Sequence, residues 1–252
     1  MFNVIKKHKV FSMTVIILGI ILLCVSCQKG NASGNIDDIG LEPPIDGLSW
    51  GMTMEEAANA LGVDKSAMEQ ISTSNGRKIF ALLYDKEIMG QKPKSIQLTF
   101  TEPYEYKDKT MPQALVGITI NYTIDKYDAI LKKMKEQYGE PIQLTGDGAV
   151  WGSRERRAEF IGTEQFNIAR DLNLAVNRID KDALTASLNE QLKSNIDTGI
   201  SGPPQTSNND NPFADRINTI TLRKMESSNE TLLISEAGFA LYIKQARELL
   251  DD

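Results

Sequence analysis

The residues that most often perform chemistry in proteins are scarce in this chain and are confined to its N-terminal end. The sequence contains one histidine, His8, and two cysteines, Cys24 and Cys27. Serine and cysteine nucleophiles of the triad type need an imidazole as their base, and structural zinc sites are built from Cys and His. Residues 28–252 therefore offer the side chains for neither kind of site, and an enzyme would have to use carboxylates, Lys, Tyr or Ser.

Carboxylates are the remaining candidates for acid–base chemistry. Glu102 lies near Glu105 in the sequence, and Asp85 lies near Glu87. A glycosidase needs two carboxylates about 5–10 Å apart, but in a chain with 34 Asp and Glu residues such pairs arise by chance. The acidic segment 180–190 lacks the glycine and the ligand spacing of a calcium loop. We expect no enzymatic activity, no cofactor and no metal site, with a carboxylate-based hydrolase as the last alternative.

The N-terminus has the pattern of an export signal. Lys6, Lys7 and Lys9 precede an uncharged apolar run over residues 10–24, which is shorter than the ~20 residues of a membrane-spanning helix. A positive start, a short apolar core and small residues before a cleavage point are typical of a secretory signal peptide. The alternative is an uncleaved N-terminal anchor helix.

The end of this apolar run resembles the lipobox of bacterial lipoproteins. In Cys24-Val25-Ser26-Cys27, small residues precede the last cysteine, although Cys24 stands where leucine is usual. The resemblance implies that residues 1–26 are a lipoprotein signal peptide and that Cys27 becomes the N-terminus and carries diacylglycerol. Two acyl chains give stable attachment, because each buried CH₂ contributes about 0.8 kcal/mol and one chain anchors only marginally. We therefore expect the protein on the extracytoplasmic face of a bacterial membrane, either the cell membrane or the outer membrane.

The exported part begins with a tether and is acidic. Residues 27–46 are rich in Gly, Ser, Asn, Asp and Pro, a composition typical of a flexible coil. Three of the 28 Lys and Arg residues precede Cys27, so 25 basic residues stand against 34 acidic ones in the exported part. Such a balance is unsuited to nucleic acid or to a flat contact with an anionic membrane. We expect membrane contact through the lipid anchor only.

Capping signals and helical periodicity predict two amphipathic helices. Residues 53–56 form an S/T-x-x-E capping box, and apolar residues follow at helical spacing up to Gly62, which suits a left-handed C-terminal cap. Residues 65–71 are expected to add another turn or two. A second, longer helix is expected to be capped by Asp125 and to end at Gly139.

Alternation of apolar and polar residues predicts antiparallel strands with one buried and one solvent-facing side. The expected strands cover residues 78–85, 94–102, 116–124, 144–152, 159–162, 172–179 and 216–225. Further helices are expected over 181–193 and 238–250, and residues 198–212, rich in Gly, Pro, Ser and Asn, are expected to form a mobile surface loop.

This order of elements predicts an α+β fold, with helices packed on one face of an antiparallel sheet. We expect two helix-plus-three-strand units in tandem over residues 47–179. Residues 180–252 are expected to form a C-terminal extension that contains the loop, a strand and a closing helix.

Two stretches resemble a known family. Residues 51–62, with their Gly-Met-Thr helix opening, and residues 127–141 resemble the SmpA/BamE family of envelope lipoproteins. A helix followed by antiparallel strands, occurring twice, is similar to the related β-lactamase inhibitor protein (BLIP) fold, over residues 48–179. The resemblance implies a non-enzymatic binding scaffold in the cell envelope, because in the inhibitor a concave sheet and a projecting hairpin loop engage a partner protein.

The loop that would correspond to this hairpin covers residues 101–112. Tyr104 and Tyr106 lie in it, and large amphipathic side chains of this kind are enriched in interfaces. The alternative is that both tyrosines only cover the edge of the sheet. Trp151 is a third candidate for partner binding, and with Trp50 it would line a groove or, alternatively, pack in the core.

A short basic run completes the candidates. Arg154, Arg156 and Arg157 stand close together in an acidic chain, where they would hold an acidic partner or belong to a solvated hairpin loop. The sequence thus predicts a lipid-anchored scaffold that binds an envelope or secreted protein. The competing class is a solute- or glycan-binding receptor, which would need a deep pocket holding Trp or Tyr.

Overall fold

The computed structural model describes residues 40–74, 76–179 and 215–251. The expected signal peptide, the first part of the tether, the helix over 181–193 and the loop over 198–212 lie outside these residues. Within the described ranges, no helix is long and apolar enough to cross a membrane.

The described chain is a mixture of helices and antiparallel strands, as an α+β fold requires. The helices are α2 (Met54–Leu61), α3 (Tyr127–Tyr138), α4 (Arg157–Phe160), α5 (Glu164–Val176) and α7 (Gly238–Asp251), with 3-10 turns at Lys65–Ala67 and Ile124–Lys126. The strands are β1 (Glu69–Ser74), β2 (Arg77–Leu82), β3 (Ser95–Thr101), β4 (Tyr104–Tyr106), β5 (Lys109–Met111), β6 (Leu115–Thr123), β7 (Gln143–Leu144), β8 (Gly148–Gly152), β9 (Thr219–Met225) and β10 (Glu230–Glu236).

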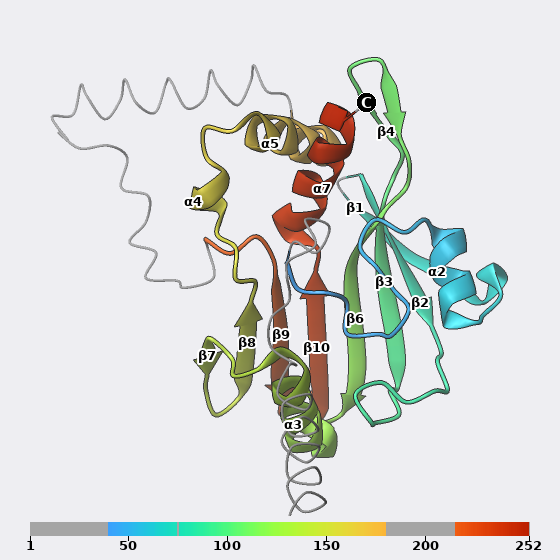
Figure 1. Cartoon of the computed structure of the whole chain (residues 1–252). Coiled ribbons are helices and arrows are strands. Elements are labelled where there is room, and N and C mark those ends of the chain that lie inside the picture. Colours follow the sequence, from blue (N-terminus) through green and yellow to red (C-terminus); the bar gives the residue numbers. More distant parts are fainter. Residues whose placement is uncertain (1–39, 75, 180–214, 252) are drawn as a thin grey trace, which may run out of the picture. The chain divides into compact units, whose positions relative to one another are not determined.

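One large sheet organises these elements (Figure 1). Its eight strands follow the order β1-β2-β3-β6-β10-β9-β8-β7, and each neighbouring pair is antiparallel. Strands β4 and β5 form a separate hairpin between β3 and β6. Strands β9 and β10, both from the part of the chain after residue 180, lie inside this sheet, where β10 pairs with β6 and β9 pairs with β8.

The first core cluster covers one face of the sheet. It joins α2 and α3 to alternate side chains of the strands, among them Phe100, Ile120 and Leu222, and α3 and the segment leading into α2 cross in front of the strands in Figure 1. The expected ends of α2 are confirmed: the Thr53 side chain accepts from the Glu56 backbone in a complete capping box, and Gly62 closes the helix in the left-handed region.

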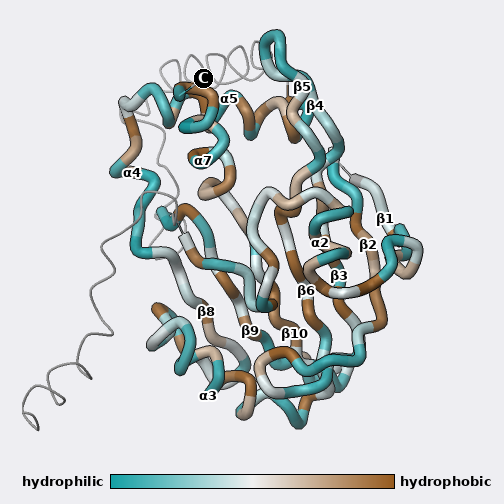
Figure 2. Tube along the Cα trace, turned by 45° about the vertical axis from the view of Figure 1, so that its right-hand side comes forward, coloured by the Kyte–Doolittle hydropathy of each residue, from teal (hydrophilic) through white to brown (hydrophobic). Residues whose placement is uncertain are grey.

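The second core cluster lies between α5 and α7. It contains Ile168, Leu172 and Val176 of α5 with Phe239 and Ile243 of α7, and Figure 2 shows both helices together beyond one end of the strands. The helices therefore do not all pack on one face of the sheet.

The strands expected over 159–162 and 172–179 are wrong, because these residues belong to α4 and α5. Thr163 caps α5 by accepting from the Phe166 amide at 3.1 Å. The buried residues of α5 then recur at helical spacing and face α7 rather than a sheet.

Three further expectations need correction. The turns expected over 65–71 are one 3-10 turn followed by β1. Asp125 lies inside the second 3-10 turn and does not cap α3, which starts at Tyr127. Strand β10 was not expected, because two of its core-facing residues, Thr231 and Ser235, are polar.

Candidate functional site

The sheet has a second face that neither core cluster includes. Strand alternation places on this face the residues whose chain neighbours point into the first core cluster. We call them the open face: Ile79, Ala81, Ser95, Gln97, Thr99, Thr119, Asn121, Val150, Thr219, Thr221, Arg223, Leu232 and Ile234. None of its apolar members belongs to, or packs against, either buried cluster of the described residues.

Strand register aligns the open face into rows. The central row runs across five neighbouring strands through Gln97, Thr119, Ile234, Thr221 and Val150. It contains no charged residue, although 25% of the chain is charged. Four of its five side chains are β-branched, so their χ1 angles are already restricted and little rotamer entropy would be lost when a partner covers them.

Charged groups lie around this neutral centre. On β10, Glu230 accepts hydrogen bonds from Lys94 Nζ at 2.8 Å and from Asn121 Nδ2 at 2.9 Å, and these bonds lower its pKa from 4.5 to about 2. Glu236 marks the other end of β10 and is exposed, as is Arg223 on β9. A centre depleted in charge within a polar rim is the composition typical of a protein interface. Sequence periodicity did not predict this charge-depleted centre, because Leu232 and Ile234 are apolar on the side away from the core.

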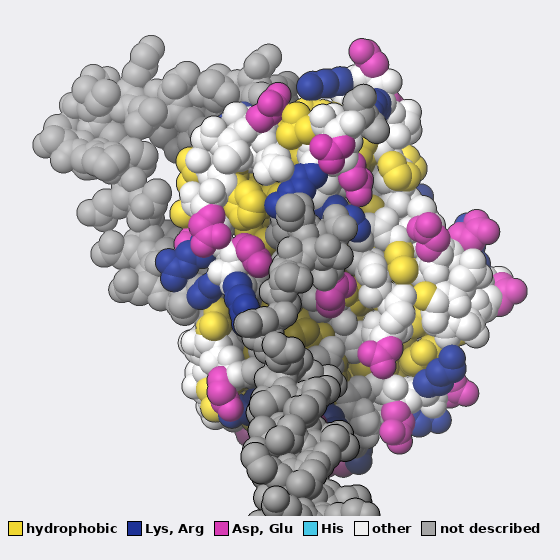
Figure 3. Space-filling model, viewed as in Figure 1, with side chains coloured by type: hydrophobic (Ala, Val, Ile, Leu, Met, Phe, Trp, Pro, Cys, Tyr) yellow, Lys and Arg dark blue, Asp and Glu magenta, His cyan; other side chains and the backbone are white. Residues whose placement is uncertain are grey.

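The helix-covered side has a different surface. Figure 3 shows this side, with acidic and basic side chains spread over the part of its surface that is not drawn in grey. Its charges follow from helices whose outer positions face water. The charge-depleted centre is therefore a property of the open face and not of the whole described surface.

The open face is hollowed over β7, β8 and β9. The hollow has a volume of about 450 Å³ and is lined by Gln143, Val150, Thr219, Thr221 and Arg223, among others. None of the described residues that line it is aromatic. This is a polar depression in a sheet and lacks the Trp or Tyr expected of a pocket for a sugar.

Tyr104 and Tyr106 lie away from the open face, on the β4–β5 hairpin. Both side chains are half-buried against the α5–α7 cluster. The Tyr104 hydroxyl donates to Gln245 Oε1 at 3.1 Å, and burial raises the pKa of this phenol. Lys107 Nζ lies 5.4 Å from the centre of the Tyr106 ring. The hairpin is thus fixed to the helices, and a partner contact through its tyrosines stays a prediction.

The two tryptophans are core residues. Trp151 is 2% exposed and Trp50 is 7% exposed. Each indole N–H donates to a backbone carbonyl at 2.8 Å, that of Gly139 for Trp151 and that of Leu41 for Trp50. Trp151 therefore has no surface to offer a partner, which corrects its selection as a binding residue: a buried indole with a satisfied N–H is what a core position requires.

The two members of the first candidate carboxylate pair contact different partners. Glu102 forms ion pairs with Lys78 at 3.5 Å and with Arg178, whereas Glu105 accepts from Thr110 Oγ1 at 2.8 Å. Asp85 and Glu87 are exposed on the connection between β2 and β3. In the ranges that the structure describes, no group of three or more His, Cys, Asp or Glu side chains could hold a metal ion.

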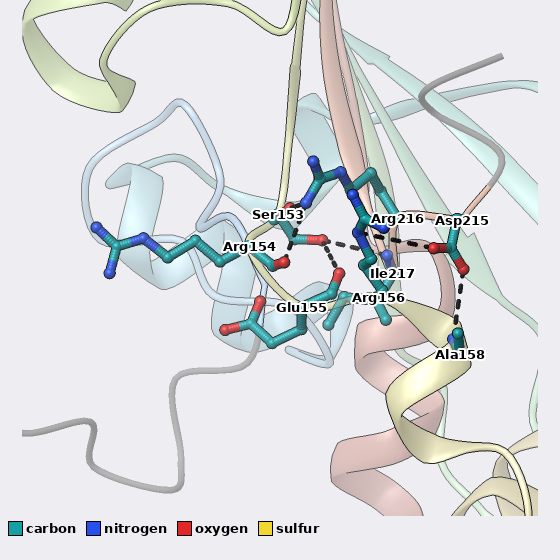
Figure 4. Close-up of polar contacts among 8 residues, drawn as sticks. All are labelled: Ser153, Arg154, Glu155, Arg156, Ala158, Asp215, Arg216 and Ile217. Carbon is teal, nitrogen blue, oxygen red and sulfur yellow. Dashed lines mark hydrogen bonds and ion pairs between the residues drawn. The ribbon is translucent and has the colours of Figure 1, made fainter. Parts of the chain in front are cut away.

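The basic run is held by a compact set of polar contacts (Figure 4). Arg216 Nη1 donates to the carbonyls of Ser153 and Arg154 at 2.9 and 3.0 Å. Ser153 Oγ accepts from the Ile217 amide at 3.1 Å, and Asp215 accepts from the Ala158 amide at 3.3 Å. These bonds fix the segment that leads into α4, while the Arg154 side chain points away from the set.

Comparison with known proteins adds no assignment. The chain matches no protein-family model, no curated protein and no solved structure.

Proposed function

We propose that this chain is a lipid-anchored, extracytoplasmic and non-enzymatic scaffold that binds another envelope or secreted protein through the open face. The observation that carries the proposal is the central row of the sheet, which is neutral, mostly β-branched and outside both core clusters. Buried interface centres are depleted in charged residues. A sheet face that contacts only water can carry charged residues freely.

The shape and the lining residues favour a protein over a solute. The central row crosses five strands, and neighbouring strands lie about 4.8 Å apart, so the surface is broad. The hollow at one side is polar and has no aromatic residue among its described lining. A glycan receptor would be expected to stack its sugar on an aromatic ring in a deeper pocket.

The topology supports a scaffold made of two similar units. Helix α2 precedes β1, β2, β3 and β6, and helix α3 precedes β7, β8, β9 and β10. The last strand of each set pairs with the other, β6 with β10, in the middle of the sheet. Both helices contribute to the same core cluster. In this arrangement two helix-plus-four-strand units, rather than the helix-plus-three-strand units expected from sequence, share one continuous open face.

The proposed anchor is compatible with partner binding near a membrane. Cys27 precedes the first described residue, Gly40, by only a short Gly-, Ser- and Asn-containing segment. A flexible coil of this length reaches about 20 Å. Diacylglycerol on Cys27 would therefore keep the open face within reach of proteins at the membrane surface.

Photo-cross-linking in cells tests this proposal. A photoreactive residue is placed at Thr119 or Thr221 in the central row, and at Glu136, which is exposed on α3, as the matched control. We expect a discrete adduct that contains one other protein from positions 119 and 221 and none from 136. Equal adducts from all three positions, or adducts only from a control placed on the β4–β5 hairpin, would contradict binding through the open face.

A further inference from the structure

A small cavity lies where strand ends meet the α5–α7 layer. Its volume is about 160 Å³, and its lining comes from β2, β6, β10, α4, α5 and α7. The polar side chains of this lining are Arg77, Arg157, Asn173, Glu236 and Tyr242. We call this cavity the arginine pocket.

Arg77 has donor capacity that the fold does not use. Its Nη2 donates to Asn177 Oδ1 over a long 3.4 Å, and its positive charge lies close enough to the Tyr242 hydroxyl to influence the pKa of that group. Among the described residues, its buried Nε has no hydrogen-bond partner. Buried polar groups are nearly always paired, and a buried donor on a cation is especially costly to leave unpaired. An acceptor atom of a bound ligand would pair with the remaining donors of the Arg77 guanidinium.

Arg157 brings a second positive charge to the pocket. Its guanidinium carbon lies 5.4 Å from the centre of the Phe239 ring, a cation–π contact that holds the side chain. Its backbone amide donates to the Asp215 carbonyl at 2.8 Å, which holds the start of α4 against the segment before β9. Glu236 also lines the pocket, but no carboxylate of the described chain lies within ion-pair distance of Arg77 or Arg157.

Two neutral groups add further donors. Burial raises the pKa of Tyr242, so its hydroxyl stays protonated and can donate. The Asn173 Oδ1 accepts from Asn177 Nδ2 at 2.9 Å, which leaves the Asn173 amide nitrogen free to donate. Guanidinium groups match the two oxygens of a carboxylate in bidentate geometry.

The arginine pocket adjoins the open face. Glu236 lies opposite Gly117 of β6 and Thr219 of β9 in the sheet register. Arg77 stands two residues before Ile79 on β2 and therefore on the same side of that strand. A polypeptide that lies along the open face can extend one side chain, or its C-terminus, into the pocket.

We infer that the arginine pocket binds a carboxylate of the partner protein, either an Asp or Glu side chain or the C-terminal carboxylate, and anchors the partner at one end of the open face. Arg and Tyr are also the residue types enriched among interface hot spots. The source of the carboxylate rests on the proposed function, whereas carboxylate recognition by the pocket is a property of this chain alone.

Titration of the purified full-length protein with N-acetylglutamate tests the inference, with N-acetylglutamine amide, in which both carboxylates are replaced by amides, as the uncharged probe. The arginine Nε–H resonances are followed by NMR. We expect N-acetylglutamate to saturate the shifts of Arg77 and Arg157 and N-acetylglutamine amide to bind at least about tenfold more weakly, because a charge-assisted contact is lost. Arg157→Gln should weaken binding of N-acetylglutamate by about tenfold. Arg154→Gln removes the same charge from a side chain outside the pocket and should leave binding within about twofold.

Three results would overturn the inference: equal affinity for the two probes, equal losses in Arg157→Gln and Arg154→Gln, or saturation by inorganic phosphate without saturation by N-acetylglutamate. Arg157 is exposed, so its variant should melt like the parent protein, and the melting curve checks this. Arg77→Lys keeps the charge but loses the planar fork, and a loss of affinity for N-acetylglutamate is expected.

The outcome is separable from that of the proposed function. If N-acetylglutamate binds as expected but position 119 gives no cross-link, the pocket stands and the protein-binding role of the open face fails. If the cross-link forms and Arg157→Gln leaves its yield equal to that of Arg154→Gln, the open face stands and the anchoring role of the pocket fails.

Discussion

On strand β6, Ile118 and Ile120 point into the core cluster that contains α2 and α3, whereas Thr119 and Asn121 of the same strand point to the open face. The two faces share one backbone and one set of hydrogen bonds. The core face is filled by large apolar side chains that the helices cover. The open face carries mostly short, β-branched or amide side chains, and its apolar members lie outside both core clusters. This difference is the basis of the proposed contact with a partner.

The largest difference between the two faces is expected when one side chain on each face is shortened. Phe100 is fully buried and packs edge-on against Phe80 at 5.9 Å. Phe100→Ala should lower the free energy of unfolding by about 3–5 kcal/mol, because transfer energy is lost and a cavity remains. Ile234→Ala on the open face should cost no more than about 1 kcal/mol. Chemical denaturation measures both, and similar losses would show that the open face is packed.

A second comparison concerns two glycines with positive φ. A Cβ on Gly76 would lie 2.2 Å from the Val176 carbonyl oxygen, at φ +72°. A Cβ on Gly62, at φ +69°, would come no closer than 3.3 Å to the flexible end of Lys86. Gly76→Ala should therefore cost about 3 kcal/mol and Gly62→Ala about 1–2 kcal/mol.

Hydrogen exchange shows which element is destabilised in Gly76→Ala. Because Gly76 meets the last turn of α5, Gly76→Ala should speed amide exchange in α5 and leave α2 protected. Faster exchange in α2 alone would contradict the close approach of the β1–β2 turn to α5.

The two core clusters can be compared through their helix caps. Thr53 Oγ1 accepts from the Glu56 amide at 3.3 Å in α2, and Thr163 Oγ1 accepts from the Phe166 amide at 3.1 Å in α5. Thr53→Ala and Thr163→Ala should each lower the free energy of unfolding by about 1 kcal/mol. Thermal denaturation measures the losses. A Thr163→Ala variant as stable as the parent would mean that α5 is not capped as described.

The smallest expected effect is the pH dependence at the edge of the open face. The pKa of Glu230 is lowered from 4.5 to about 2, first by its hydrogen bond from Lys94. A lowered carboxyl pKa in the folded state contributes stability above pH 4.5, and this contribution disappears as the pH falls toward 2. Glu230→Gln should therefore flatten the decline of stability between pH 4.5 and 2. Urea denaturation over this range measures the slope, and parallel curves for variant and parent would contradict the pairing.

Much of the fold could be predicted from local signals. The capping box and Gly62 gave both ends of α2, and clean alternation located β3 and β6. Helix α5 was missed because Leu172, Leu174 and Val176 alternate with Asn173 and Ala175, which imitates a strand. Only the packing of Leu172 and Val176 on α7 reveals the helical period.

The candidate site was hidden for a different reason. Strand β10 places polar Thr231 and Ser235 toward the core and apolar Leu232 and Ile234 away from it. This pattern inverts the rule by which strand faces are assigned from sequence. The pairing of β10 with β6, more than one hundred residues apart, brings Thr119 beside Ile234, and no local signal encodes that contact. Residue type alone predicted a binding role for Tyr104, Tyr106 and Trp151. The two tyrosines pack against the α5–α7 cluster, and Trp151 lies in the first core cluster.

The most direct measurement replaces Thr221, in the middle of the central row, by arginine and follows the cross-link that a photoreactive residue at Gln97 forms in cells. Thr221 is half-buried on the side of the sheet away from the core, so Thr221→Arg should lower the free energy of unfolding by no more than about 1 kcal/mol. The same change places an uncompensated charge in the proposed contact with a partner. We expect that Thr221→Arg abolishes the adduct and that Glu136→Arg, on α3, leaves it intact. An undiminished adduct in a folded Thr221→Arg protein would contradict protein binding through the open face.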